Sequence, residues 1–231
     1  MKYNLYDKEF EVFEEIIDLP LNKIYYEDND GLDLFNKMKS TKCWMDNTEG
    51  SPDLLSEKFK TMIECMQIND YTENGITNNF AKDNNEIIKE INKAFDVKQT
   101  FPNLKNIFID KEVPPKYCSI DNYKKMCHRV ISKHINNIPK YRSNYSGFKL
   151  VFLIIDLTET NYCMKLDNDL AYLPMIEWHP IMDDNVMGIF LDKDVDYILW
   201  YRPFLQHSIL KQLAIINNKR LSIFVNKFRK N

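Results

Sequence analysis

The chain has 231 residues, of which 44% are hydrophobic and 13% aromatic. A chain of this length and composition buries a substantial core, which excludes an intrinsically disordered protein and favours a single domain. The longest apolar run, residues 150–155, is too short for a transmembrane helix, and the charged N-terminus lacks the apolar core of a signal peptide. We therefore expect a cytoplasmic protein that does not enter the membrane.

The formal net charge is only −3, but the charges are unevenly distributed. Residues 1–57 hold fourteen Asp/Glu against six Lys, whereas residues 122–149 hold seven Lys/Arg and residues 205–231 hold six, both without an acid. Clusters of Lys and Arg release counterions from phosphates, so the basic segments favour a nucleic acid as partner. A solvated helix face and a basic tail explain them equally well, and the acidic segment suits a basic protein partner.

Several common kinds of site are excluded by the pattern of cysteines and glycines. The five cysteines are odd in number and form no Cys-x-x-Cys pair, which indicates reduced thiols rather than disulfides or a zinc site. The five glycines are scattered singly, so neither a P-loop nor a dinucleotide-binding loop is present. There is no Gly-x-Ser-x-Gly elbow of a serine hydrolase either.

The N-terminal half is predicted to contain a helix, a hairpin and a second helix. Apolar residues at three- and four-residue spacing predict a helix over residues 7–17 that ends before Pro20. A hairpin follows, with one arm formed by residues 43–47 and 52–55 and the other by residues 59–68. The polar residues 70–82 then predict a loop, and residues 84–95 predict a helix.

The C-terminal half alternates between predicted strands and helices. The elements we expect are a strand at 106–110, a helix at 122–138, a strand at 148–157, an irregular segment at 161–190, a strand at 196–201, a helix at 205–216 and a strand at 221–225. This alternation predicts an α/β (or α+β) fold in which helices flank a mixed central sheet. Since no repeat or low-complexity linker interrupts the chain, we expect residues 1–231 to form one domain.

The hairpin carries the most informative residues. Ser51-Pro52-Asp53 lies on its first arm and Ile63-Glu64-Cys65-Met66 on its second. The two-residue period of a strand places Glu64 on one face with Lys60, Met62, Met66 and Ile68. A carboxylate between two methionines loses hydration, and it needs a cation, a hydrogen bond or a proton in compensation.

A helix with acidic residues, then Pro-Asp, then an acidic-x-basic triplet, then a helix and a strand resembles the PD-(D/E)XK nuclease superfamily. The resemblance implies a restriction-endonuclease-like core over roughly residues 7–110, with residues 111–231 as a C-terminal elaboration. It implies that Asp53 and Glu64 bind Mg²⁺, together with Glu14 or Glu15 from the first helix. Met66 then occupies the position of the lysine that holds the attacking water.

Methionine carries no charge, so three interpretations remain open. Lys60 replaces the lysine from the same strand face, the metal acts alone, or the scaffold has lost catalysis. The first makes Asp53, Glu64 and Lys60 catalytic residues of a magnesium-dependent nuclease. The last makes the chain an inactive interaction or inhibitor protein of a phage or another mobile element, with a protein or nucleic-acid partner. In either case the candidate nucleic-acid-binding residues are Lys124, Lys125, Arg129, Lys133, Lys140 and Arg142.

Three further positions are weaker candidates. His128 and His134 are six residues apart on one predicted helix and cannot bind one ion together. Asp156 ends a buried strand, where open α/β sheets place functional groups, but it equally caps the following turn. The segments 178–180 and 200–203 are either partner-binding surface or core, since Trp is most often buried.

Overall fold

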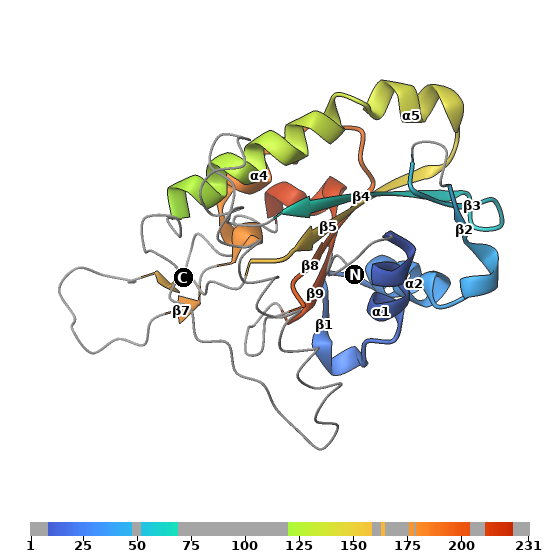
Figure 1. Ribbon diagram of the computed structural model, residues 1–231, viewed down its shortest axis with the longest axis horizontal. Coiled ribbons are helices and arrows are strands. Elements are labelled where there is room, and N and C mark those ends of the chain that lie inside the picture. The colour runs from blue at the N-terminus through green and yellow to red at the C-terminus, as the bar shows by residue number, and fades with distance from the viewer. Residues whose placement is uncertain are drawn as a thin grey trace, which may run out of the picture.

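The computed structural model describes residues 9–47, 52–68, 120–158, 163–164, 176–177, 179–203 and 211–223. Within these residues a seven-stranded mixed sheet is flanked by helices, as Figure 1 shows, and this confirms the α/β class. The helices are α1 (Glu9–Ile17), α2 (Asn29–Met38), α4 (Ile120–Ile135), α5 (Ile138–Asn144) and α6 (Asp184–Met187). Short 3-10 turns are η1 (Leu21–Lys23), η2 (Thr41–Cys43), η4 (Pro180–Met182), η5 (Gly188–Phe190) and η6 (Asn218–Arg220).

The sheet has the strand order β1-β9-β8-β5-β4-β3-β2. Its strands are β1 (Ile24–Tyr26), β2 (Met45–Asp46), β3 (Leu54–Ser56), β4 (Thr61–Ile68), β5 (Lys149–Asp156), β8 (Tyr197–Tyr201) and β9 (Leu213–Asn217). Neighbours from β2 to β4 are antiparallel, β4, β5 and β8 are parallel, β9 runs antiparallel to β8, and β1 runs parallel to β9. A separate small sheet pairs β6 (Cys163–Met164) with β7 (Ile176–Glu177).

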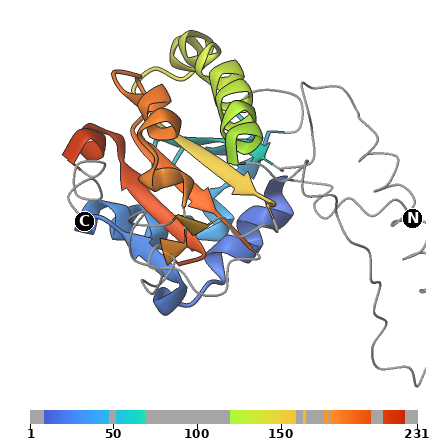
Figure 2. The same ribbon diagram turned by 90° about the vertical axis from the view of Figure 1, so that its left-hand side faces the viewer.

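The two faces of the sheet are covered by different parts of the chain. On one face, residues of α4, α5, α6 and the turns η4 and η5 belong to the same core cluster as Met62 and Met66 of β4. On the other face, α1 and α2 pack on Ile63 and Cys65 of the same strand. Figures 1 and 2 show α4 and α5 on the opposite side of the sheet from α1 and α2. The central strand β5 is buried from Leu150 to Asp156, which explains its continuous apolar sequence.

Helix α2 and strand β1 occupy a segment in which the sequence predicted only a connection. Asp28 caps the helix, since its side chain accepts a hydrogen bond from the Gly31 amide at 2.9 Å. The buried residues of α2 recur at helical spacing and are Gly31, Leu34, Phe35 and Met38. This period was present in the sequence, but the many Asp and Asn residues around it suggested a loop.

The predicted helix over residues 205–216 and strand over 221–225 are wrong where the structure describes them. Residues 213–217 form β9, between β8 and β1, and residues 221–223 are helical. Leu213 to Ile216 are buried on both faces of the sheet. A strand of this kind has no polar residue at alternate positions, so its apolar run fits a helix as well as a strand.

The first helix, the helix that begins near residue 122 and the strands at 148–157 and 196–201 are present, with ends shifted by a few residues. The hairpin is also present, but its first predicted arm forms two antiparallel strands, β2 and β3. The segment 161–190, predicted to be irregular, contains β6, β7 and α6. The loop at 70–82, the helix at 84–95 and the strand at 106–110 lie outside the described residues. β4 pairs directly with β5, so one sheet joins residues from both sides of position 110. No helix in the described ranges is long and apolar enough to cross a membrane.

Candidate functional site

The hairpin of β3 and β4 brings Asp53 and Glu64 together. Leu54 pairs with Ile63 in an antiparallel register, and Asp53, directly before β3, therefore lies across from Glu64. The Oδ2 atom of Asp53 accepts a hydrogen bond from the backbone amide of Cys65 at 2.6 Å. The spatial proximity expected from the Pro-Asp and Glu-x-Met segments is thus present.

Glu64 is enclosed rather than open. Only 4% of this residue is exposed, and Met62 and Met66, which share its face of β4, are 0% and 2% exposed. His134, in the last turn of α4, places Nδ1 2.7 Å from Oε1 of Glu64. The other carboxylate oxygen, Oε2, is buried and has no hydrogen-bond partner among the described residues. The hydrogen bond with His134 therefore offsets part of the hydration that the Glu64 carboxylate loses on burial.

Tyr141 completes this cluster from α5. Its hydroxyl is buried without a hydrogen-bond partner in the described part of the chain. Burial, the adjacent Glu64 carboxylate and, more weakly, Asp53 raise the pKa of Tyr141. The phenol therefore stays protonated at neutral pH, where it can donate to a carboxylate but cannot act as a base.

The other two residues expected at this site lie elsewhere. Lys60 belongs to the turn before β4, with φ of 46°, and its exposed Nζ pairs with Glu57 at 2.7 Å. Its ammonium also lies 4.8 Å from the centre of the Phe148 ring. Glu14 is exposed on α1, which covers the opposite face of the sheet from Glu64.

Of the residues expected to bind Mg²⁺, Asp53 and Glu64 come together on the hairpin, whereas Glu14 lies on the other face of the sheet. No group of three His, Cys, Asp or Glu in those ranges is placed to hold a metal ion. Asp53 and Glu64 both already accept hydrogen bonds from protein groups.

The six candidate nucleic-acid-binding residues divide into two groups. Lys125, Arg129 and Lys133 are exposed on α4 at four-residue spacing, and we call these three the basic ridge; Lys140 is exposed on α5. The other two are less exposed and form ion pairs with aspartates. Lys124 pairs with Asp183 at 2.7 Å, and Arg142 donates to the Phe148 carbonyl while pairing with Asp194 and Asp196.

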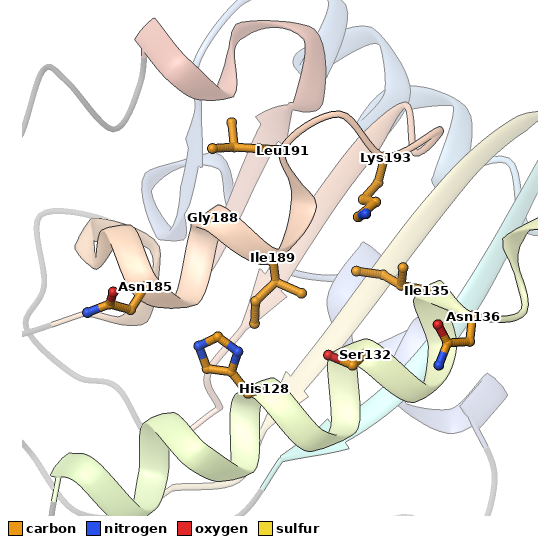
Figure 3. Close-up of a pocket in the computed structure, with 9 residues that line it drawn as sticks. All are labelled: His128, Ser132, Ile135, Asn136, Asn185, Gly188, Ile189, Leu191 and Lys193. Carbon is orange, nitrogen blue, oxygen red and sulfur yellow. The ribbon is translucent and has the colours of Figure 1, made fainter.

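An open hollow of ≈ 420 Å³ lies between α4 and the segment that contains α6 and η5 (Figure 3). One wall comes from α4 and the other from residues 185–193. The lining residues are His128, Ser132, Ile135, Asn136, Asn185, Gly188, Ile189, Leu191 and Lys193. At 100° per residue, Ser132 lies between Lys125 and His128 around the axis of α4, so the hollow adjoins the ridge.

His134 and Tyr141 are the members of the Glu64 cluster that the sequence did not identify. The sequence indicated only that His134 cannot bind one ion together with His128, and nothing connected it with a glutamate seventy positions earlier. The sequence offered only an indirect indication of this contact. A buried carboxylate requires a hydrogen-bond donor, and α4 is the first described helix after β4 in the chain.

Comparison with known proteins adds no identification: no protein-family model, curated protein or solved structure matches this chain.

Proposed function

We propose that the protein binds nucleic acid through the basic ridge of α4, on a nuclease-like scaffold that does not cleave its ligand. The ridge is the observation that carries the proposal. Lys125, Arg129 and Lys133 project to solvent from one side of a single helix, next to a hollow with a polar and apolar lining. Lys140 extends the positive charge onto α5.

The dimensions of the ridge suit a polyphosphate. Eight residues separate its ends, which corresponds to about 12 Å along the helix axis. Double-stranded DNA carries one negative charge per about 1.7 Å, so the same length of duplex presents about seven phosphate charges. Three cations at this spacing contact several phosphates at once, whatever the base sequence.

The lack of cleavage follows from the surroundings of Glu64. From α2 onward the described elements are a helix, three antiparallel strands, two helices and a parallel strand, an order compatible with the superfamily that the motif resembles. Phosphodiester hydrolysis requires a cation or donor near the charge that develops in the transition state. Here Met66, which carries no charge, stands at the position of the lysine, and Lys60 pairs with Glu57. The Glu64 carboxylate is hydrogen-bonded to His134.

A salt titration tests the proposal. Fluorescence anisotropy with DNA and RNA oligonucleotides compares the wild type with the triple variant Lys125→Gln, Arg129→Gln and Lys133→Gln. If all three side chains contact phosphates, the slope of log K against log salt becomes shallower by about 2 to 3 in the variant. The matched control, Lys39→Gln, Lys42→Gln and Lys58→Gln, removes the same charge from exposed lysines outside α4.

The control variant is expected to bind like the wild type. Equal losses in the two triple variants would mean that net charge matters and the ridge does not. A wild-type protein that binds neither DNA nor RNA at low salt would refute the proposal altogether.

The second candidate function is magnesium-dependent cleavage. It is favoured by the position of Asp53 across from Glu64 and by the unpartnered Oε2 of Glu64. We expect no cleavage of DNA or RNA with Mg²⁺ or Mn²⁺. Cleavage by the wild type that is lost in both Asp53→Asn and Glu64→Gln would establish this function in place of the first.

A further inference from the structure

A second polar cluster surrounds Asp156, at the carboxyl end of β5, where no residue is exposed. Oδ2 of Asp156 accepts hydrogen bonds from the Tyr123 hydroxyl at 2.6 Å and from Nε1 of Trp200 at 3.0 Å. Oδ1 accepts from the Thr158 amide at 3.1 Å, which confirms that Asp156 caps the following turn. Nε of Arg202 lies 3.3 Å from Oδ2. The carboxylate therefore accepts three hydrogen bonds and pairs with one cation.

The donors around Asp156 outnumber the acceptors. Nε and Nη1 of Arg202, Oγ1 of Thr158 and Nε2 of His179 are buried, and none has a hydrogen-bond partner among the described residues; Nε contacts Asp156 as an ion pair only. Nδ1 of His179 accepts from the Ile181 amide at 3.2 Å, so Nε2 carries the proton of the neutral ring. Burial and the charge of Arg202 keep the pKa of His179 well below its usual value, and the ring is a neutral donor.

These groups belong to one region of the fold. Asp156 and Arg202 stand at the carboxyl ends of β5 and β8, two neighbouring parallel strands. The His179 ring packs edge-on against Trp200, with centroids 6.2 Å apart, and Trp200 itself donates to Asp156. Open α/β sheets bind ligands at this edge. Buried donors without acceptors are rare in folded proteins, because each has lost its hydration without compensation.

We propose that Arg202, His179 and Thr158 form a buried binding site for the carboxylate group of a small organic acid. The guanidinium meets Asp156 through Nε and offers Nη1 to the ligand, while His179 and Thr158 supply two more donors. A carboxylate has about four lone-pair sites, enough for all three. The site is separate from the basic ridge and does not depend on the function proposed for it.

Charge decides between a carboxylate and a phosphate. Arg202 and Asp156 neutralise each other, and His179 is neutral, so the cluster holds no surplus cation. A monoanion adds one buried negative charge, whereas a phosphate dianion adds two without a second cation to balance them. The site therefore favours the monoanion.

Thermal unfolding and isothermal calorimetry at pH 7 test the site, with sodium acetate as the probe and sodium chloride and sodium phosphate at matched ionic strength. We expect acetate to raise the melting temperature with saturable dependence on concentration, and to do so more than either other salt. Equal stabilisation by chloride and acetate would overturn the proposal. Tighter binding of phosphate than of acetate would overturn the assignment to carboxylates.

Thr158→Val provides the sharper test, since it removes the hydroxyl while keeping the shape of the side chain. Without added anion this variant should be at least as stable as the wild type, because the lost hydroxyl has no partner among the described residues. Its affinity for acetate should fall about tenfold, as expected for one hydrogen bond to a charged group.

Thr61→Val is the matched control. Thr61 is 2% exposed, compared with 3% for Thr158, but its hydroxyl donates to the Phe59 carbonyl at 2.9 Å. We expect this variant to lower the melting temperature without changing the affinity for acetate. If Thr158→Val instead lowers the melting temperature as Thr61→Val does, and binds acetate as the wild type does, the Thr158 hydroxyl is not a ligand-binding group.

Discussion

At the scale of single residues, the contact between Glu64 and His134 decides how the nuclease-like motif is interpreted. A buried carboxylate that loses its partner keeps the full cost of desolvation. We expect His134→Ala to lower the free energy of unfolding by about 3 kcal/mol, since it leaves both oxygens of Glu64 without a hydrogen bond in the described structure. Urea denaturation of the purified variant measures this loss.

Two further variants show whether the pair itself is responsible. His128→Ala, at an exposed position of the same helix, should change stability by no more than about 0.5 kcal/mol. The double variant Glu64→Met with His134→Leu replaces the pair by apolar side chains and should recover most of the lost stability. A double variant as unstable as His134→Ala would show that the cost arises from lost packing and not from the uncompensated charge.

At the scale of elements, the sequence predicted the helices and strands in which the spacing of apolar residues reflects which sides are buried. Helix α4 is solvated on one side and buried on the other, so its apolar residues recur at the helical period. Strand β5 is a long run of buried branched residues in the middle of the sheet. The sequence of β9 predicts a helix, because its position between β8 and β1, which buries both of its faces, depends on a strand from the other end of the chain.

The candidate site was predictable to the same extent. Asp53 and Glu64 lie on one hairpin, and turn and strand patterns are local, so their proximity followed from the sequence. His134, the partner of Glu64, comes from the end of α4, and Arg202, the partner of Asp156, comes from the end of β8. Such contacts depend on which strands become neighbours in the sheet, and nothing in the local sequence specifies that.

Helix α2 provides a prediction at this scale, because Asp28 holds its N-terminus. The side chain accepts from the Gly31 amide and also from Nδ2 of Asn217 at 3.2 Å, which connects the helix to the end of β9. Asp28→Ala should therefore lower the free energy of unfolding by about 1 to 2 kcal/mol. Asp28→Asn keeps a capping oxygen and should lose clearly less. If urea denaturation shows the same loss for both variants, the charge of Asp28 stabilises the protein and its capping hydrogen bond does not.

At the scale of the whole molecule, the exposed charges of the helices differ between the two faces of the sheet. The basic ridge lies on the face covered by α4, while the face covered by α1 and α2 carries exposed acidic side chains. The exposed acids of these two helices are Glu11, Glu14, Glu15, Asp30 and Asp33. The net charge is small, but the exposed charge is distributed unevenly between the two faces. A polyanion is therefore attracted more strongly to the side of α4 than to the side of α1 and α2.

This asymmetry predicts that nucleic acid contacts one face only. A photoreactive phenylalanine derivative is incorporated either at Asn136, exposed beside the ridge, or at Glu14, exposed on α1. Neither substitution removes a cation, so both proteins should keep their affinity for the oligonucleotide. Irradiation of the bound complexes should attach the labelled strand to position 136 several times more efficiently than to position 14. Equal attachment at the two positions would contradict a one-sided complex, because the sheet lies between them and no single short duplex contacts both faces.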